Sequence, residues 1–321
     1  MNGCPTSLCF GETMLRISTK DNERFTQATE LDVGIGGTES NFAIAFSQLG
    51  GESAWLSRLP DNFLGRYVYT NVRKFGVDVS PVIFADEGRM GIYYLEMGSD
   101  PRPTEVVYDR DSTAISMIEP ESVAWGILDD YDLFFTTGIT VALSEGCKNS
   151  VRGALEEGGE GVKAFFDLNY RSKLWSFEEA RREIEPLLPN VDILSVTERD
   201  ARNVLEKDGN YLDIVRNLQV EYGLEISLMS RGSKGAVACK NGEVFESEPY
   251  EIDVVDRVGA GDVFDAAFAY GYLSGKDVKD ALHWGVAGAA FAHTLPGDVV
   301  HFDREDLERI LESKRGSDIN R

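Results

Sequence analysis

Short apolar runs alternate with segments of helical spacing along this 321-residue chain, and the alternation limits its fold more than any other feature. Three runs have the length and apolar character of buried strands, namely Leu133–Thr137, Val162–Leu168 and Val191–Val196. The segments with helical spacing beside them are Leu143–Glu157, Phe177–Leu188, Glu198–Glu206 and Tyr211–Tyr222. Strands and helices in this order predict a mostly parallel sheet that is covered by helices on both faces.

Two stretches break this rhythm, residues 13–33 and 89–110, because they are rich in β-forming residues and show no helical period. Structureless loops of about 20 residues are uncommon in compact domains, although long surface loops remain the alternative. We therefore predict that both stretches supply strands to a small second sheet, which projects from the body as a lid. Residues 1–321 would then form a single α/β domain. The open face of a small sheet favours self-association, so we expect a homo-oligomer that forms through the lid.

The chain carries 32 basic and 55 acidic side chains, which gives a formal net charge of −23 at pH 7. Such a surface repels phosphate backbones and anionic membranes, so we exclude nucleic acid and membranes as main partners. No apolar run reaches the roughly 18 residues of a membrane span, and the N-terminus lacks a signal-peptide pattern, so we expect a cytoplasmic protein. The four cysteines form no Cys-x-x-Cys pair, so neither a zinc site nor a disulfide framework is expected.

The strongest local signal is the glycine-rich segment Asp256–Asp262, which lies between a predicted strand, Tyr250–Val255, and a predicted helix, Val263–Leu273. Its glycines permit a tight turn, and the helix start adds unpaired N–H groups and the positive end of a dipole. Together these features suit a phosphoryl group that gains charge during transfer. The carboxylate of Asp262 could accept the proton of the attacking hydroxyl. Alternatively, it is an ordinary helix-start carboxylate after an ordinary turn.

A second glycine segment, Gly36–Asn41, enters a predicted helix at Thr38–Leu49. The pair Gly36 and Gly37 lets the backbone approach a polyol closely, and the amide of Asn41 could bind its hydroxyls. The alternative is a glycine turn followed by an ordinary polar helix residue.

The two glycine segments together resemble the ribokinase-like (PfkB) family of carbohydrate kinases, and the similarity in element order covers essentially the whole chain. This resemblance implies a Rossmann-like body with a small β-sheet lid and a sugar bound between them. It also implies that ATP lies along the C-terminal part of the sheet with Mg²⁺. Many members bind a monovalent cation such as K⁺ near the second glycine motif.

The resemblance also assigns roles to residues. Asp262 would be the catalytic base, and the backbone of Gly259, Ala260 and Gly261 would form an anion hole. The nucleotide side would be built from these two glycines together with Ser195, Glu198, Arg231, Gly232 and Gly235. Ser195 stands where the family's Asn-x-x-Glu region has asparagine, so Glu198 is the residue that carries over, as an indirect metal ligand.

The choice of sugar depends on arginines near strand ends. Arginine binds a carboxylate with two parallel hydrogen bonds, so Arg110 and Arg171 could hold a sugar acid, although both could instead be surface residues paired with acidic neighbours. The surrounding patterns resemble the 2-keto-3-deoxygluconate kinases within the family. This resemblance implies a substrate site made of Gly36, Gly37, Asn41, Tyr93, Tyr108, Arg110, Asn169, Arg171 and Asp262. Thr38 and Asp298 depart from the usual pattern.

The expected reaction is the transfer of a phosphoryl group from ATP to the terminal hydroxyl of 2-keto-3-deoxygluconate, which gives the 6-phosphate. The alternatives are a kinase of 2-keto-3-deoxygalactonate, fructose or ribose, and a sugar-binding sensor without catalysis. An intact Gly-Ala-Gly-Asp sequence at 259–262 argues against the sensor, because a sensor needs neither an anion hole nor a base.

Overall fold

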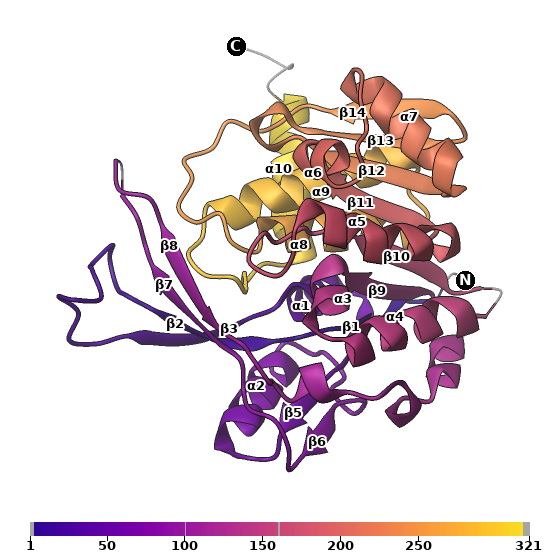
Figure 1. Ribbon diagram of the computed structural model, residues 1–321. Coiled ribbons are helices and arrows are strands. Elements are labelled where there is room, and N and C mark those ends of the chain that lie inside the picture. Colours follow the sequence, from indigo (N-terminus) through magenta and orange to yellow (C-terminus); the bar gives the residue numbers. More distant parts are fainter. Residues whose placement is uncertain (1–2, 100, 160, 317–321) are drawn as a thin grey trace.

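A computed structural model describes residues 3–99, 101–159 and 161–316, and within these ranges an eight-stranded sheet forms the centre of the molecule (Figure 1). The strands in spatial order are β14 (Glu243–Ser247), β13 (Ala236–Lys240), β12 (Ile226–Ser230), β11 (Ile193–Thr197), β10 (Lys163–Asp167), β9 (Leu133–Thr137), β1 (Thr6–Phe10) and β4 (Glu52–Leu56). From β4 to β12 neighbouring strands are parallel, whereas β13 and β14 pair in the antiparallel direction.

Helices cover both faces of this sheet, as the sequence predicts. One side carries α1 (Thr38–Gln48), α8 (Ala260–Leu273) and α9 (Val278–His293), with α2 (Phe63–Arg73) and α10 (Arg304–Gly316) at its margins. The other side carries α3 (Gly138–Leu143), α4 (Glu145–Glu157), α5 (Phe177–Ile184), α6 (Glu198–Asn203) and α7 (Tyr211–Tyr222). Short 3₁₀ helices lie at Ile115–Met117, Pro120–Ser122, Trp125–Asp130, Glu185–Asn190 and Gly232–Lys234.

Alternate residues of the central strands point to opposite faces and fill two separate cores. Phe135 and Phe165 lie in the core on the α1 side, where the ring centroids of Phe42 and Phe135 are 3.9 Å apart. Their neighbours Phe134 and Phe166 lie in the core on the opposite side. Full burial of each such side chain contributes about 1.5–3 kcal/mol, so the unbroken apolar runs stabilise a sheet that is covered on both faces.

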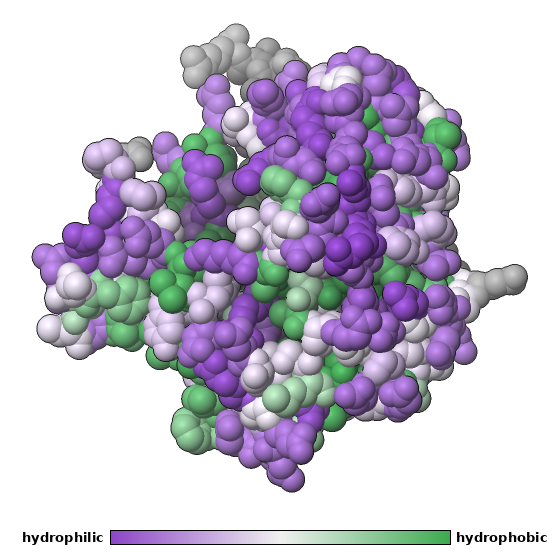
Figure 2. All heavy atoms as spheres, in the orientation of Figure 1, coloured by the Kyte–Doolittle hydropathy of each residue, from purple (hydrophilic) through white to green (hydrophobic). Residues whose placement is uncertain are grey.

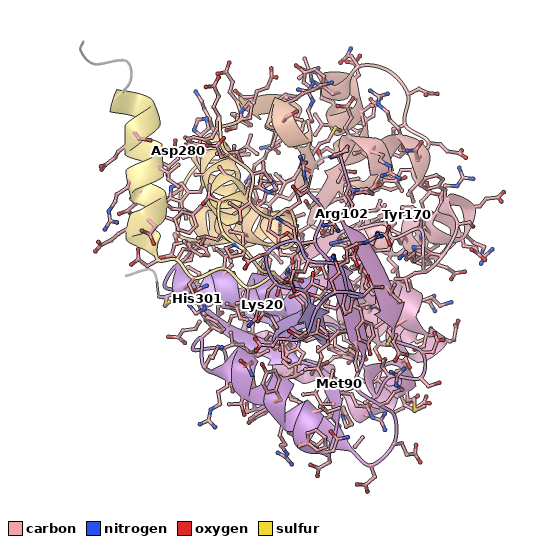
Figure 3. All side chains as sticks on the ribbon, turned by 90° about the vertical axis from the view of Figure 1, so that its left-hand side faces the viewer. Lys20, Met90, Arg102, Tyr170, Asp280 and His301 are labelled. Carbon is pink, nitrogen blue, oxygen red and sulfur yellow. The ribbon has the colours of Figure 1, made fainter. Side chains whose placement is uncertain are left out.

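The lid is the four-stranded sheet β3 (Asp32–Gly36), β2 (Met14–Ser18), β7 (Ile92–Glu96) and β8 (Glu105–Asp109), in that spatial order. It projects beside the central sheet in Figure 1, and its segments with Lys20 and Arg102 face the viewer in Figure 3. The predicted small sheet is therefore present, although β3 continues three residues beyond Val33. A further pair, β5 (Arg58–Pro60) and β6 (Ile83–Ala85), lies next to α2.

The register of the lid strands separates its two faces. Arg16 lies opposite Gly34 and Tyr93, and Tyr93 lies opposite Tyr108, so these residues share one face. The other face carries the row Val33, Ile17, Tyr94 and Val107. The polar face is turned toward the body, because Tyr93 binds a side chain of the C-terminal region.

Three predicted elements differ in the structure. Tyr250–Val255 is not a strand, because the chain leaves the sheet after β14, and Val254 and Val255 are 45% and 52% exposed. The predicted helix Phe177–Leu188 ends as an α-helix at Ile184 and continues as a 3₁₀ helix, in which Pro186 and Pro189 cannot donate backbone hydrogen bonds.

The predicted helix Leu143–Glu157 differs at its start, because Leu143 is the last residue of α3 and α4 begins at Glu145. The hydroxyl of Ser144 accepts a hydrogen bond from the Cys147 amide and caps α4.

Parallel strands bring their carboxyl ends to one edge of the sheet, and polar residues collect there. Glu12 follows β1, Asp167 ends β10, and Glu198 follows β11. The lid strands β2 and β3 connect to the same edge through Gly11–Thr13 and Gly37. The candidate site therefore lies where the lid meets the carboxyl edge. Among the described residues, no helix is both long enough and apolar enough to cross a membrane.

Candidate active site

The glycine-rich segment turns sharply before α8. Gly259 has a φ of 79°, in the left-handed region that favours glycine, and a Cβ added there would lie 2.3 Å from the backbone oxygen of Asp298. Ala260, Gly261 and Asp262 form the first turn of the helix, where backbone amides have no intrahelical acceptor. In the described part of the chain, no other group accepts from these three amides. The helix start thus presents unpartnered donors to an anion.

Gly261 keeps open the space in front of those donors. A Cβ added at Gly261 would meet no atom within 4 Å. Figure 2 shows a recess in the molecular surface between the lid and the body. The geometry of the turn therefore fits a phosphoryl group, which needs backbone donors and unfilled space beside them.

Asp262 lies beside these donors and is bound by α1. It is 7% exposed, and the Asn41 Nδ2 donates to its Oδ2 at 2.7 Å. Burial raises the pKa of Asp262 to about 8, while the Asn41 hydrogen bond and the charge of Arg171 act in the opposite direction. A carboxylate with a pKa near the working pH is suited to act as a general base.

The segment after β10 completes this side of the site. Asn169 has a positive φ of 40°, and its Nδ2 and backbone N donate to the two carboxylate oxygens of Asp167 at 2.6 and 3.1 Å. Burial raises the pKa of Asp167 to about 7, and Arg171 lowers it. Arg171 is exposed, and none of the ion pairs among the described residues includes it. Its charge lowers the pKa values of Asp167 and Asp262, so it contributes positive potential to the site.

The sequence predicts that Arg110 could hold the carboxylate of a sugar acid, but in the structure it is paired with an acidic neighbour. It reaches from the lid to the carboxylate of Glu12 and forms an ion pair there, with side chains that are 10% and 3% exposed. The Oε1 of Glu12 and the Nε of Arg110 are buried, and no partner for either atom occurs in the described residues. The charge of Arg110 is thus matched by Glu12, and a ligand would meet the remaining N–H donors of a neutral pair.

Other protein atoms approach Gly36 and Gly37 so closely that neither position has room for a side chain. A Cβ at Gly36 would lie 2.2 Å from the Asp298 Oδ2 and 2.3 Å from the Tyr93 hydroxyl, and a Cβ at Gly37 would lie 2.1 Å from the Glu12 carbonyl oxygen. Tyr93 donates to the Asp298 Oδ2 at 2.5 Å. These lid residues therefore contact the body directly, and the tyrosine predicted to bind substrate already has a partner in Asp298.

The residues predicted on the nucleotide side gather after β11 and β12. Glu198 accepts from the Arg202 Nη2 at 2.8 Å and from the Arg231 Nε at 3.2 Å, and these hydrogen bonds lower its pKa. The guanidinium of Arg231 lies 3.4 Å from the ring centroid of Tyr211. Gly232 and Gly235 both have a positive φ. The loop after β12 therefore brings its two glycines and an arginine to the first residue of α6.

A bound metal ion would need ligands from outside the protein. Within the described residues, no group of three or more His, Cys, Asp or Glu side chains could hold a metal ion. Magnesium commonly uses one or two carboxylates together with waters and substrate phosphates. Both oxygens of Glu198 are already bound by arginines. Glu198 therefore fits a role through metal-bound water.

Comparisons with known proteins identify the family of this chain. Residues 5–301 match the model of the pfkB family of carbohydrate kinases. This chain belongs to that family. It is 43% identical to the 2-dehydro-3-deoxygalactonokinase of Haloferax volcanii over 310 residues, which cover 96% of each chain. It is 30% identical to the 2-dehydro-3-deoxygluconokinase of Thermoproteus tenax, with 91% of this chain and 89% of the relative covered.

A solved structure gives the same result for the fold. The crystal structure of the 2-dehydro-3-deoxygluconokinase from Thermotoga maritima matches with a TM-score of 0.92 and 34% sequence identity. The match covers 97% of this chain and 99% of that one. The predicted ribokinase-like fold and the predicted family are confirmed.

Two buried carboxylates of this pfkB-family kinase were not predicted. Asp265, one turn after Asp262 on α8, accepts from the Ser195 hydroxyl at 2.7 Å, and burial raises its pKa. Ser195 therefore binds a protein carboxylate, whereas the sequence predicts a role toward nucleotide. Glu39 accepts from the hydroxyls of Thr137 and Thr140 at 2.7 and 2.6 Å. For Asp265 the signal was the spacing of three from Asp262, which puts both on one helix face.

The pH dependence of kcat/KM should follow the ionisation of the Asp262 carboxyl. We expect kcat/KM to fall about tenfold per unit as the pH drops below about 8, because the protonated carboxyl cannot accept a proton. Asn41→Ala removes a hydrogen bond that lowers this pKa, so the break in the profile should move to higher pH. Initial rates of the wild type and of Asn41→Ala at several pH values test both expectations. A flat wild-type profile between about pH 6 and pH 9 would contradict the assignment.

Proposed function

We propose that this kinase transfers the γ-phosphoryl group of ATP to the terminal hydroxyl of a 2-keto-3-deoxy sugar acid, a compound also called a 2-dehydro-3-deoxy sugar acid. The observation that carries the proposal is the buried Asp262 beside the unpartnered amides of the anion hole, with Arg171 nearby. Bound Mg²⁺ would neutralise charge on the nucleotide phosphates. The protein supplies the base, the donors and the orientation of the acceptor.

In the proposed reaction, an unprotonated Asp262 oxygen accepts the proton of the substrate hydroxyl as its oxygen attacks the γ-phosphorus. Asn41 holds the other carboxylate oxygen and keeps the base in one orientation. The amides of Ala260 and Gly261 donate to the phosphoryl oxygens, whose charge must be held during transfer. The adenine and the remaining phosphates would lie toward the loop with Gly232 and Gly235.

The positive charge of Arg171 is the reason for proposing a substrate that carries a carboxylate. On a chain of net charge −23, an exposed arginine that has no ion pair among the described residues, and that lowers the pKa values of Asp167 and Asp262, is a local source of positive potential. A sugar carboxylate there would gain charge-assisted hydrogen bonds, whereas neutral fructose and ribose would not. Asn169, Tyr108 and the Arg110–Glu12 pair can contribute hydrogen bonds to the hydroxyls and the keto group.

Two stereoisomers of the sugar acid remain as candidates. The sequence patterns favour 2-keto-3-deoxygluconate, in agreement with the names of the relatives at 30% and 34% identity. The relative at 43% identity is a 2-dehydro-3-deoxygalactonokinase, and this favours the galactonate form as the second candidate. The two compounds differ in configuration at C4, so one substrate pocket could accept either.

A substrate panel tests the proposal. We expect ADP release to depend on added sugar and kcat/KM to be highest for 2-keto-3-deoxygluconate or 2-keto-3-deoxygalactonate. Fructose and ribose should be at least about tenfold poorer, because they lack the carboxylate that Arg171 would bind. A preference for a neutral sugar would contradict the substrate class. Sugar binding without any ADP release would favour the sensor alternative.

Removing the side chain of Arg171 should weaken the use of the sugar acid and leave the use of ATP unchanged. For Arg171→Ala we expect the KM of the sugar acid to rise about 10- to 100-fold, because a charge-assisted pair is lost. The KM of ATP should stay near the wild-type value. Arg182→Ala is the matched control, since Arg182 is an exposed arginine on α5 that pairs with Glu183. Equal losses for both ligands in steady-state kinetics would contradict the assignment of Arg171.

A monovalent cation such as K⁺ also belongs to the proposal, through the family resemblance. Asp256 and Asp298 adjoin the glycine motif, and both bind the guanidinium of Arg16. All four carboxylate oxygens of these two residues already accept hydrogen bonds, so a K⁺ would have to be held mainly by backbone oxygens of these loops.

We also propose that the kinase associates through the apolar face of its lid. Val33 and Val107 are 54% and 62% exposed and belong to the row with Ile17 and Tyr94. The double variant Val33→Asp/Val107→Asp should be a monomer by light scattering, because charges in an apolar interface are costly. Val220→Asp, a change at an exposed valine on α7, should leave the oligomer intact. A monomeric wild-type protein would contradict this proposal.

A further inference from the structure

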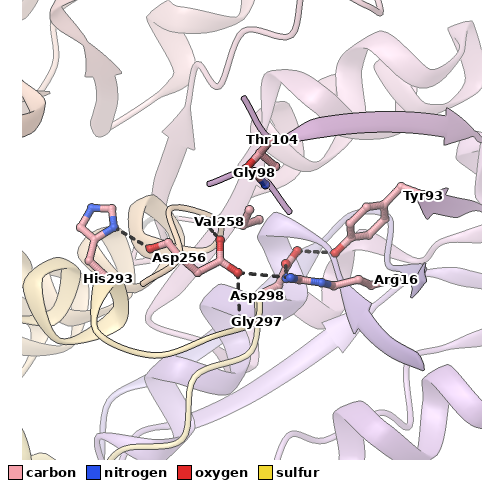
Figure 4. A network of polar contacts seen from close by, with 9 residues as sticks. All are labelled: Arg16, Tyr93, Gly98, Thr104, Asp256, Val258, His293, Gly297 and Asp298. Carbon is pink, nitrogen blue, oxygen red and sulfur yellow. Dashed lines mark hydrogen bonds and ion pairs between the residues drawn. The ribbon is translucent and has the colours of Figure 1, made fainter. Parts of the chain in front are cut away.

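Arg16 links the lid to two distant loops. It lies on β2, is 7% exposed, and binds carboxylates that are 240 and 282 positions away in sequence. Its Nη2 donates to the Asp256 Oδ2 at 3.2 Å, and its Nη1 donates to the Asp298 Oδ1. Figure 4 shows the guanidinium between the two carboxylates. The lid and the C-terminal region are therefore joined by a buried ion-pair network.

Asp256 joins the two loops to each other. Its Oδ1 accepts from the Val258 amide at 3.1 Å, and its Oδ2 accepts from the Gly297 amide at 3.0 Å as well as from Arg16. The His293 Nδ1 lies 3.0 Å from the Asp256 backbone oxygen. This carboxylate thus fixes the start of the glycine-rich turn and the loop before Asp298.

Asp298 lies directly between the lid and the glycine-rich turn. Its Oδ1 is bound by Arg16, and its Oδ2 accepts from the Tyr93 hydroxyl at 2.5 Å. On the opposite side, its backbone oxygen lies 2.3 Å from the position that a Cβ of Gly259 would take. Movement of Asp298 would therefore change the position of Gly259 and of the amides that follow it.

The charges make Arg16 necessary for this arrangement. Asp256 and Asp298 are 4% and 6% exposed, and Arg16 is the cation in ion pairs with both. Removing one partner from a buried ion pair leaves an uncompensated charge. The planar guanidinium can serve two carboxylates with separate nitrogens, whereas an ammonium group acts as a single point charge. The shape of the arginine, as well as its charge, sets the distance between the loops.

We propose that Arg16 is a positioning residue of the kinase, which holds the anion hole in its working shape and couples that shape to the lid. The inference rests on the proposed function, because it gives the glycine-rich turn the role of binding the phosphoryl group. When the lid lies as in this structure, Arg16 orders Asp256, Asp298 and the Gly259 turn. When the lid moves away, the two carboxylates lose their shared cation and the turn loosens.

The first test is Arg16→Lys, which keeps the positive charge and protects the fold. We expect kcat to fall about tenfold or more on the best sugar of the panel, since the misplaced donors act mainly in the transition state. Hydrogen–deuterium exchange in residues 256–262 should become faster. The control is Arg102→Lys, because Arg102 is a lid arginine that pairs with Glu96 within the lid. An Arg16→Lys enzyme with wild-type kcat and exchange would overturn the proposal.

The second test is chemical rescue of Arg16→Ala. Millimolar guanidinium should restore part of kcat in this variant, and an equal concentration of NaCl should not. A variant that stays inactive while circular dichroism shows it folded, and that guanidinium does not rescue, would also overturn the proposal. The exchange measurement needs no sugar, so it judges the role of Arg16 even if the panel shows that the assigned substrate is wrong. Failure of the wild-type enzyme on the panel would instead count against the proposed function alone.

Discussion

Asp262→Asn should lower kcat by about three orders of magnitude and leave the protein folded. The carboxamide is nearly the same size as the carboxylate and can still contact Asn41, but it cannot accept the proton of the attacking hydroxyl. The KM values should change little, because the anion hole and Arg171 remain. Steady-state kinetics with ATP and the sugar acid measure the loss, and Asp130→Asn, at an exposed aspartate, is the control. Retention of most of kcat would remove Asp262 from the role of base.

The same variant should be more stable than the wild type at alkaline pH. The pKa of Asp262 rises from 3.8 to about 8 on folding, mainly because of burial. Between these two values the folded state holds a proton that the unfolded state has lost, so this group makes stability fall as the pH rises from about 4 to about 8. Asparagine removes that penalty, and the melting temperature at about pH 9 should rise by about 2 °C or more. A lower melting temperature at that pH would contradict the raised pKa.

Gly259→Ala should damage both the fold and the activity. The residue has a φ of 79°, and its Cβ would lie 2.3 Å from the Asp298 backbone oxygen, so the turn must shift. We expect a loss of about 2–3 kcal/mol in the free energy of unfolding. We also expect a fall of about 100-fold in kcat, because the amide donors move away from the transferred group. Thermal unfolding and steady-state kinetics measure the two effects.

Gly261→Ala is the matched control for that prediction. Gly261 lies on the first turn of α8, and an added Cβ meets no atom within 4 Å. Alanine should therefore keep or slightly improve stability, since it favours a helix by up to about 1 kcal/mol over glycine. Activity should still fall, because the methyl group enters the space that the phosphoryl group needs. If Gly261→Ala unfolds more easily than Gly259→Ala, this account of the turn is wrong.

Local features of the sequence were sufficient to predict the covered parallel sheet and the small lid sheet. The run Leu133–Thr137 is β9 without any change of bounds, because an unbroken apolar run has one favourable place in a covered parallel sheet. The second lid stretch likewise contains β7 and β8. Helix and strand ends were predicted less well. The predicted helix Glu198–Glu206, for example, is α6 and ends at Asn203.

The candidate site was predictable where one motif contains its residues. The turn at Gly259 and the carboxylate of Asp262 follow from the same short segment, and Asn41 from another. Pairing across the fold was not predictable. Arg110 binds Glu12, which is 98 positions away, and Arg16 binds Asp298, which is 282 positions away. Their partners depend on how lid and body close, and a single sequence carries no local signal for that distance.

The most direct test of the central claim is ³¹P NMR of the product that the wild-type kinase forms from ATP, Mg²⁺ and the 2-keto-3-deoxy sugar acids. We predict a single phosphomonoester on the terminal carbon, formed with equal release of ADP and lost when Asp262 is replaced by asparagine. Inorganic phosphate as the only new signal, or an ester formed equally well by the Asp262→Asn variant, would contradict a base that works beside the Gly259–Gly261 amides.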